Sequence, residues 1–103
     1  MIDTQSIQKA ILIFEQKNAL VTIKTENYDI YMEPLTHHNI LLTLRININY
    51  DITNIMQKIS QEKYAKFQIS IYKDMLQISC FLAIKHLTID KLTDNIRLLE
   101  QFI

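Results

Sequence analysis

The sequence predicts a single α+β domain over residues 1–103, with an antiparallel sheet covered by helices in the order α-β-β-β-α-β-β-α. Two observations lead to this prediction. Three segments begin with a residue that can cap a helix, and between them lie two stretches in which apolar and polar residues alternate. The length is sufficient for one hydrophobic core.

The three predicted helix starts share one pattern. Asp3, Asp51 and Thr88 each carry a side-chain oxygen that can accept a hydrogen bond from an unpaired amide of the first turn. The residue before each cap and the residue four positions after it are apolar, as in a hydrophobic staple. These pairs are Ile2 and Ile7, Tyr50 and Ile55, and Leu87 and Leu92.

The first helix is predicted from Thr4 to about Lys17, and Asn18 can adopt the left-handed conformation that ends a helix. Its apolar stripe comprises Ile7, Ala10, Ile11 and Phe14. Residues 19–25 and 28–33 then predict a hairpin with a two-residue turn. In this register Lys24 pairs with Asp29, Ile23 with Ile30, Thr22 with Tyr31 and Val21 with Met32, so apolar residues meet on one face.

The middle of the chain predicts a third strand and a second helix. Pro34 is expected to interrupt the ladder, and a loop leads to a strand over residues 40–48. One face of this strand carries Ile40, Leu42, Leu44, Ile46 and Ile48. The helix is predicted from Asp51 to about Tyr64, with an apolar stripe made of Ile52, Ile55, Met56 and Ile59.

A second hairpin and a last helix complete the predicted fold. With Lys73 and Asp74 as the turn, the buried face of the hairpin comprises Phe67, Ile69, Ile71, Leu76, Ile78 and Cys80. The opposite face carries Phe81 and Ala83, which is unusually apolar for a solvated surface. The last helix follows Thr88, with Ile89, Leu92, Ile96, Leu99 and Ile103 as its buried stripe.

Composition disfavours several classes of function. Lys and Arg number 11, as do Asp and Glu, so no net field attracts nucleic acid or an anionic membrane. The chain has no glycine, which excludes the common phosphate-binding loops and nucleophile elbows and forces other residues into its turns. One cysteine, no signal-like N-terminus and no long apolar run favour a soluble protein of the cytoplasm.

Candidate catalytic and metal-binding residues have simpler interpretations. His37, His38 and Glu33 resemble a metal cluster, but adjacent residues of an extended chain point in opposite directions. Cys80 with His86 as its base would need hydrogen-bond reach, and its apolar face makes Cys80 a packing residue. We therefore expect no metal, no cofactor and no enzymatic activity.

Two further groups of residues are candidates for function. Asp90 and Asp94 lie on one helix face beside basic residues and read as an ordinary solvated surface. The strand tyrosines, Tyr28, Tyr31 and Tyr72, would suit base stacking only beside more cations than Lys24 and Lys66 supply. We expect no nucleic-acid binding.

The order of elements resembles the type III secretion chaperone-like fold, which includes chaperones of secreted bacterial effectors and the YbjN-like domains. The residues that carry the likeness are mainly in the second half of the chain: residues 55–59, 64–71, 76–82 and the pair Leu87 and Thr88. The resemblance implies a homodimer that binds an extended segment of another protein along apolar surface and performs no chemistry.

Met56, Met75, Phe81 and Ala83 are the residues we expect to bind the partner, because a second subunit or a client chain would bury them. The alternative is that the first and last helices cover these positions within one monomer. The sequence thus predicts a chaperone-like protein-binding module. Its alternative is a small phage- or plasmid-encoded inhibitor or immunity-type protein that blocks one folded partner.

Overall fold

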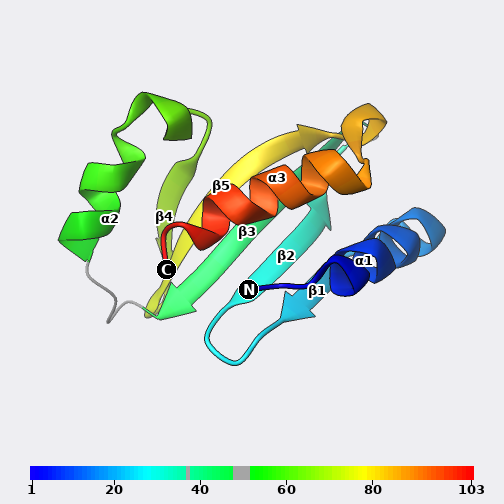
Figure 1. Ribbon diagram of the computed structural model, residues 1–103, viewed down its shortest axis with the longest axis horizontal. Coiled ribbons are helices and arrows are strands. Elements are labelled where there is room, and N and C mark those ends of the chain that lie inside the picture. Colours follow the sequence, from blue (N-terminus) through cyan, green and yellow to red (C-terminus); the bar gives the residue numbers. More distant parts are fainter. Residues whose placement is uncertain (37, 48–51) are drawn as a thin grey trace.

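The structure is a computed structural model that describes residues 1–36, 38–47 and 52–103. It confirms an α+β fold with three α-helices and a five-stranded antiparallel sheet of order β1-β2-β3-β5-β4 (Figure 1). The elements are α1 (Thr4–Lys17), β1 (Val21–Lys24), β2 (Asp29–Pro34), β3 (Asn39–Asn47), α2 (Ile52–Ile59), η1 (Glu62–Tyr64), β4 (Gln68–Tyr72), β5 (Met75–Ala83), η2 (Ile84–His86) and α3 (Ile89–Glu100).

Two of the three predicted caps are confirmed. Asp3 accepts a hydrogen bond from the Ser6 amide at 2.7 Å, and Thr88 accepts one from the Lys91 amide at 3.2 Å. Asn18 ends α1 in the left-handed conformation with φ 45°. The predicted cap Asp51, with Tyr50 and Ile48, lies outside the described residues.

The second helix is shorter than predicted. We expected it to reach Tyr64, but α2 ends at Ile59 and a separate 3-10 turn, η1, follows. Of the predicted stripe only Ile55 is buried, while Met56 is exposed. The chain leaves the helix because Tyr64 must turn inward, where its ring centroid lies 4.7 Å from that of Phe102.

Both hairpin registers are confirmed. The first pairs Ile23 with Ile30 and Val21 with Met32, and the second pairs Ile69 with Ile78. Pro34 does not interrupt the ladder as predicted, because it forms the last pair between β2 and β3. In the turn of the second hairpin Lys73 adopts the left-handed conformation, with φ 56°. Glycine usually occupies such positions, and in this chain, which has no glycine, another residue must do so.

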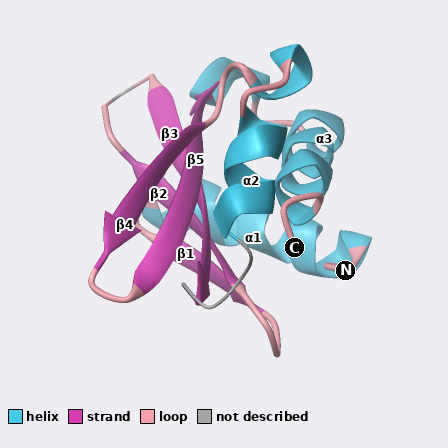
Figure 2. Cartoon of the chain, turned by 90° about the vertical axis from the view of Figure 1, so that its left-hand side faces the viewer, coloured by secondary structure: helices cyan, strands magenta, loops and turns pink. Residues whose placement is uncertain are grey.

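The core lies between one face of the sheet and the helices (Figure 2). Two predicted core residues are wrong. Ile71 is 63% exposed, because β4 is the outermost strand and its turn end extends past the covering helices. Ile103 is 43% exposed, because α3 ends at Glu100 and the following turn directs Phe102 into the core instead.

Candidate functional site

The second face of the sheet carries no helix in the described part of the chain (Figure 2). We call it the open face. It is hollowed by a cavity of about 570 Å³. Strand alternation places its lining residues in two groups, one apolar and one polar, at opposite ends of β3 and β5.

The apolar end of the open face is formed by Leu20, Leu35, Leu41 and Phe81, and the exposed Glu33 lies across from Leu41 at this end. Phe81 lies directly across from Leu41 in the ladder between β5 and β3. Its side chain is 56% exposed, and Leu20 and Leu35 are also exposed. The sheet thus presents several apolar side chains to solvent in one place, which is typical of a surface that contacts another molecule.

The polar end is organised around Arg45. Its Nε and Nη2 atoms both donate to Oε1 of Gln77, at 3.0 and 2.7 Å. The guanidinium carbon lies 4.4 Å from the ring centroid of Tyr31 and 5.2 Å from that of Tyr72. Both contacts are in the range of cation–π interactions, so neighbours on β2, β4 and β5 orient the Arg45 side chain before any ligand arrives.

The charge of Arg45 has no carboxylate partner among the described residues, whose only ion pair joins Arg97 to Glu100. Asp29 is the cross-strand neighbour of Arg45, yet its Oδ2 accepts from the Tyr31 hydroxyl at 3.2 Å. Burial and the Asp29 charge raise the pKa of Tyr31, so this phenol stays a neutral donor. The guanidinium is therefore oriented, and it forms no ion pair within the described residues.

Hydroxyl groups join the two ends. Thr43 and Ser79 are paired across β3 and β5, and their hydroxyl oxygens lie 3.0 Å apart. Thr43 is buried although it lies on the open face, because the larger side chains of Leu41 and Arg45, its neighbours on the same face of β3, extend further from the sheet. The floor of the hollow is consequently small and polar between Arg45 and Phe81.

The structure brings together three of the four predicted partner-binding residues. Met75, Phe81 and Ala83 lie on β5 and share the open face, where Phe81 is the most exposed of them. Met56 lies on α2, on the opposite side of the sheet (Figure 2). No helix of the described residues covers Phe81, whose side chain is exposed, so the alternative in which helices bury it within the monomer is wrong for this residue.

Arg45, Gln77 and their contacts with Tyr31 and Tyr72 are not among the residues predicted from the sequence. Part of the cluster is visible in the sequence, since Tyr31 and Tyr72 are aromatic residues on predicted strands. What was missing was the register between β3 and β5, which pairs Arg45 with Gln77. Tyr28 does not belong to this cluster, because it lies on the helix side and donates to Glu100.

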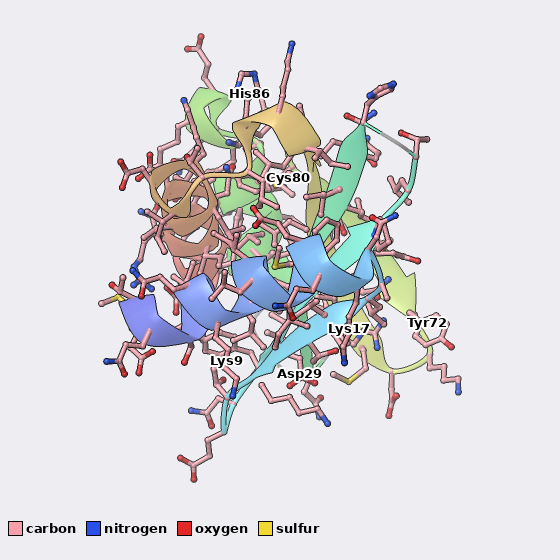
Figure 3. The ribbon with its side chains drawn as sticks, turned by 90° about the vertical axis from the view of Figure 1, so that its right-hand side faces the viewer. Lys9, Lys17, Asp29, Tyr72, Cys80 and His86 are labelled. Atoms are coloured by element: carbon pink, nitrogen blue, oxygen red, sulfur yellow. The ribbon has the colours of Figure 1, made fainter. Side chains whose placement is uncertain are left out.

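The cysteine has no features of a nucleophile. Cys80 is 1% exposed on the core face of β5, and burial raises the pKa of its thiol to about 11. His86 lies on η2 at the periphery of the molecule (Figure 3). Asp90 and Asp94 are exposed on α3. His37 lies outside the described residues.

Neither the described residues nor comparisons with known proteins assign a function to this surface. Within the described residues, no group of three or more His, Cys, Asp or Glu is arranged to hold a metal ion. No helix of that part of the chain combines the length and apolarity needed to cross a membrane. No protein-family model matches the chain, and no curated protein matches it significantly.

Proposed function

We propose that the protein is a non-enzymatic, chaperone-like module of the cytoplasm that holds an extended segment of a partner protein on the open face. The observation that carries this proposal is the exposure of Phe81, 56%, on the open face that Leu20, Leu35 and Leu41 also line. Burying apolar surface contributes roughly 25 cal/mol per Å², which favours association once docking costs are met.

The rows of side chains beneath the hollow favour an extended segment as the occupant. The hollow measures about 570 Å³, and its lining includes alternate residues of β3 from Leu41 to Arg45 and of β5 from Gln77 to Phe81. An extended chain directs every second side chain to the same side, so it matches the alternating rows of the sheet. The second candidate is an inhibitor that blocks one folded partner. Interfaces with folded partners concentrate their binding energy in a few aromatic and Arg side chains, and the cluster of Arg45, Tyr31 and Tyr72 has this composition.

We further propose that two copies of the chain pair through the outer edge of β4. The backbone of β4 is hydrogen-bonded on one side by β5, and no other described strand pairs with it. Its five residues include no charge and no proline, which are the usual devices that protect an edge. An antiparallel pair of β4 strands centred on Ser70 would place Ile69 of each copy opposite Ile71 of the other.

The opposite edge of the sheet is better protected. β1 has only four residues and ends in Lys24, and α1 packs against it (Figure 1). A short, charged and covered strand is a poor template for a second chain. The contrast between the two edges is why β4 and not β1 is the proposed site of pairing.

The binding function is tested by selecting random twelve-residue peptides from a phage-displayed library on the immobilised protein. Peptides that bind the parent should lose about ten-fold or more in affinity for Phe81→Glu, because a charge then occupies the apolar end. Leu12→Glu is the matched control, since Leu12 is 59% exposed on α1. A library that yields no binding peptide, or peptides indifferent to Phe81→Glu, would contradict the proposal.

A further inference from the structure

We infer that Arg45 is an anion seat that selects an acidic residue in the bound segment. The inference rests on the function proposed above and specifies its ligand: an extended peptide with a carboxylate on Arg45 and an apolar side chain on Phe81 and Leu41. Charge complementarity is the argument, because Arg45 is the one cation that lines the hollow and it forms no ion pair within the described residues.

The orientation of the guanidinium leaves donors available. A guanidinium has five N–H groups, and the two bonds to Gln77 use one on Nε and one on Nη2. The remaining groups can reach a carboxylate that enters the hollow. The rings of Tyr31 and Tyr72 and the amide of Gln77 have already restricted the side chain, so less conformational entropy is lost when a ligand binds.

The distance between the two ends determines the spacing of the motif. Arg45 and Leu41 are four residues apart on β3, and their partners Gln77 and Phe81 are four apart on β5. Four residues of an extended chain span about 13 Å. A segment that runs along these strands would thus carry its acidic and apolar residues four positions apart. The residue midway lies over Thr43 and Ser79, where a small polar side chain fits.

The surroundings favour a peptide over a nucleic acid. The hollow is lined by one cation, Arg45, and also by Glu33, while Asp29 is the cross-strand neighbour of Arg45. Phosphates in a row would meet these carboxylates, whereas nucleic-acid binding gains most of its affinity from several cations along the backbone. A peptide with a single carboxylate on Arg45 instead places an uncharged, apolar residue at the other end, where Glu33 lies across from Leu41.

The test uses two peptides that differ in one group, acetyl-Asp-Thr-Ser-Thr-Leu-amide and its analogue with Asn in place of Asp, titrated by NMR. The parent should prefer the Asp peptide by about ten-fold, and Arg45→Gln should abolish this preference. Arg45→Lys should retain part of it, because the charge stays and the planar fork is lost. Lys9→Gln on α1, whose side chain lies away from Tyr72, is the control and should change nothing (Figure 3).

A second variant keeps the test decisive if Arg45→Gln does not fold. Asp29→Asn removes the carboxylate across the ladder from Arg45. This variant should bind the Asp peptide with a few-fold higher affinity and the Asn peptide with unchanged affinity. Equal affinity of the parent for both peptides overturns the inference, and if that shared binding still depends on Phe81 the proposed function stands. Tighter, Arg45-dependent binding of oligothymidylate than of the Asp peptide overturns it in favour of a nucleic acid.

Discussion

Tyr28, in the first hairpin, donates a hydrogen bond from its hydroxyl to the carboxylate of Glu100, the last residue of α3. The same carboxylate accepts from the Ile2 amide at 2.9 Å and from Arg97 at 2.6 Å. Glu100 therefore ties together the N-terminus, the hairpin and the last helix, which are far apart in sequence. These contacts lie on the helix side of the sheet, away from the open face.

Removal of the Tyr28 hydroxyl should destabilise the protein without affecting peptide binding. A hydrogen bond to a charged group contributes about 1.5 to 3 kcal/mol, so Tyr28→Phe should lower the free energy of unfolding by an amount in this range. Urea denaturation of the two proteins measures it. Tyr72→Phe, at an exposed tyrosine of β4, is the matched control, and an equal loss for both variants would contradict a specific role of the Tyr28 bond.

The stability of the protein should depend on pH through Glu100. Burial raises the pKa of this carboxyl. The hydrogen bonds from Tyr28, Ile2 and Arg97, together with the charge of Arg97, lower the pKa by more than burial raises it, so the pKa lies below its ordinary value. The unfolded chain thus takes up the proton first. The stabilisation is present above about pH 5 and is lost as pH falls through the lowered pKa of the folded state.

Glu100→Gln should remove this component of the pH dependence. Thermal unfolding of parent and variant between about pH 3 and pH 7 measures it: the parent should gain more stability with rising pH than the variant does. Asp94→Asn, an exposed residue of the same helix, is the control and should follow the parent. Parallel curves for parent and Glu100→Gln would show that the carboxylate is not stabilised by its three donors.

Thr88 should contribute to stability through the cap of α3. Its side chain accepts from the Lys91 amide, so Thr88→Ala leaves that amide without this partner and should cost about 0.5 to 2 kcal/mol. Thr88→Ser retains the hydroxyl and should stay close to the parent. Chemical denaturation of the three proteins decides the matter, and an unchanged midpoint for Thr88→Ala would mean that the bond does not stabilise the helix.

Cys80 should be almost inert in the folded protein. With its pKa raised to about 11 by burial, about one thiol in a thousand is ionised at pH 8. Ellman's reagent should therefore react slowly with the native protein and rapidly once denaturant is added. Leu12→Cys, at a site on α1 where the native side chain is 59% exposed, provides the fast reference under native conditions. Equal rates at both positions would refute the buried placement of Cys80.

The β4 edge predicts the oligomeric state. The parent should be a dimer in light scattering at tens of micromolar, and Ile71→Lys should be a monomer with an unchanged circular dichroism spectrum, because lysine protects an edge strand. Leu12→Lys, at a similarly exposed apolar site on α1, should remain dimeric. A monomeric parent, or a dimer that tolerates Ile71→Lys, would exclude pairing through β4.

Local patterns in the sequence were sufficient to predict much of the fold. The caps at Asp3 and Thr88 and the pairs within both hairpins depend on residues a few positions apart, where side-chain chemistry and turn length leave few alternatives. The same alternation predicted that Phe81 lies on the face opposite the core, as the structure shows.

Tertiary structure alone decided the rest. The pairing of β3 with β5 joins residues far apart in sequence, such as Arg45 and Gln77, which are 32 positions apart, and nothing local specifies which strands become neighbours or which face the helices cover. That pairing brings Gln77 to Arg45 and creates the anion seat. The strand order also leaves β4 at the edge, so that Ile71 is exposed although its local pattern is that of a core residue.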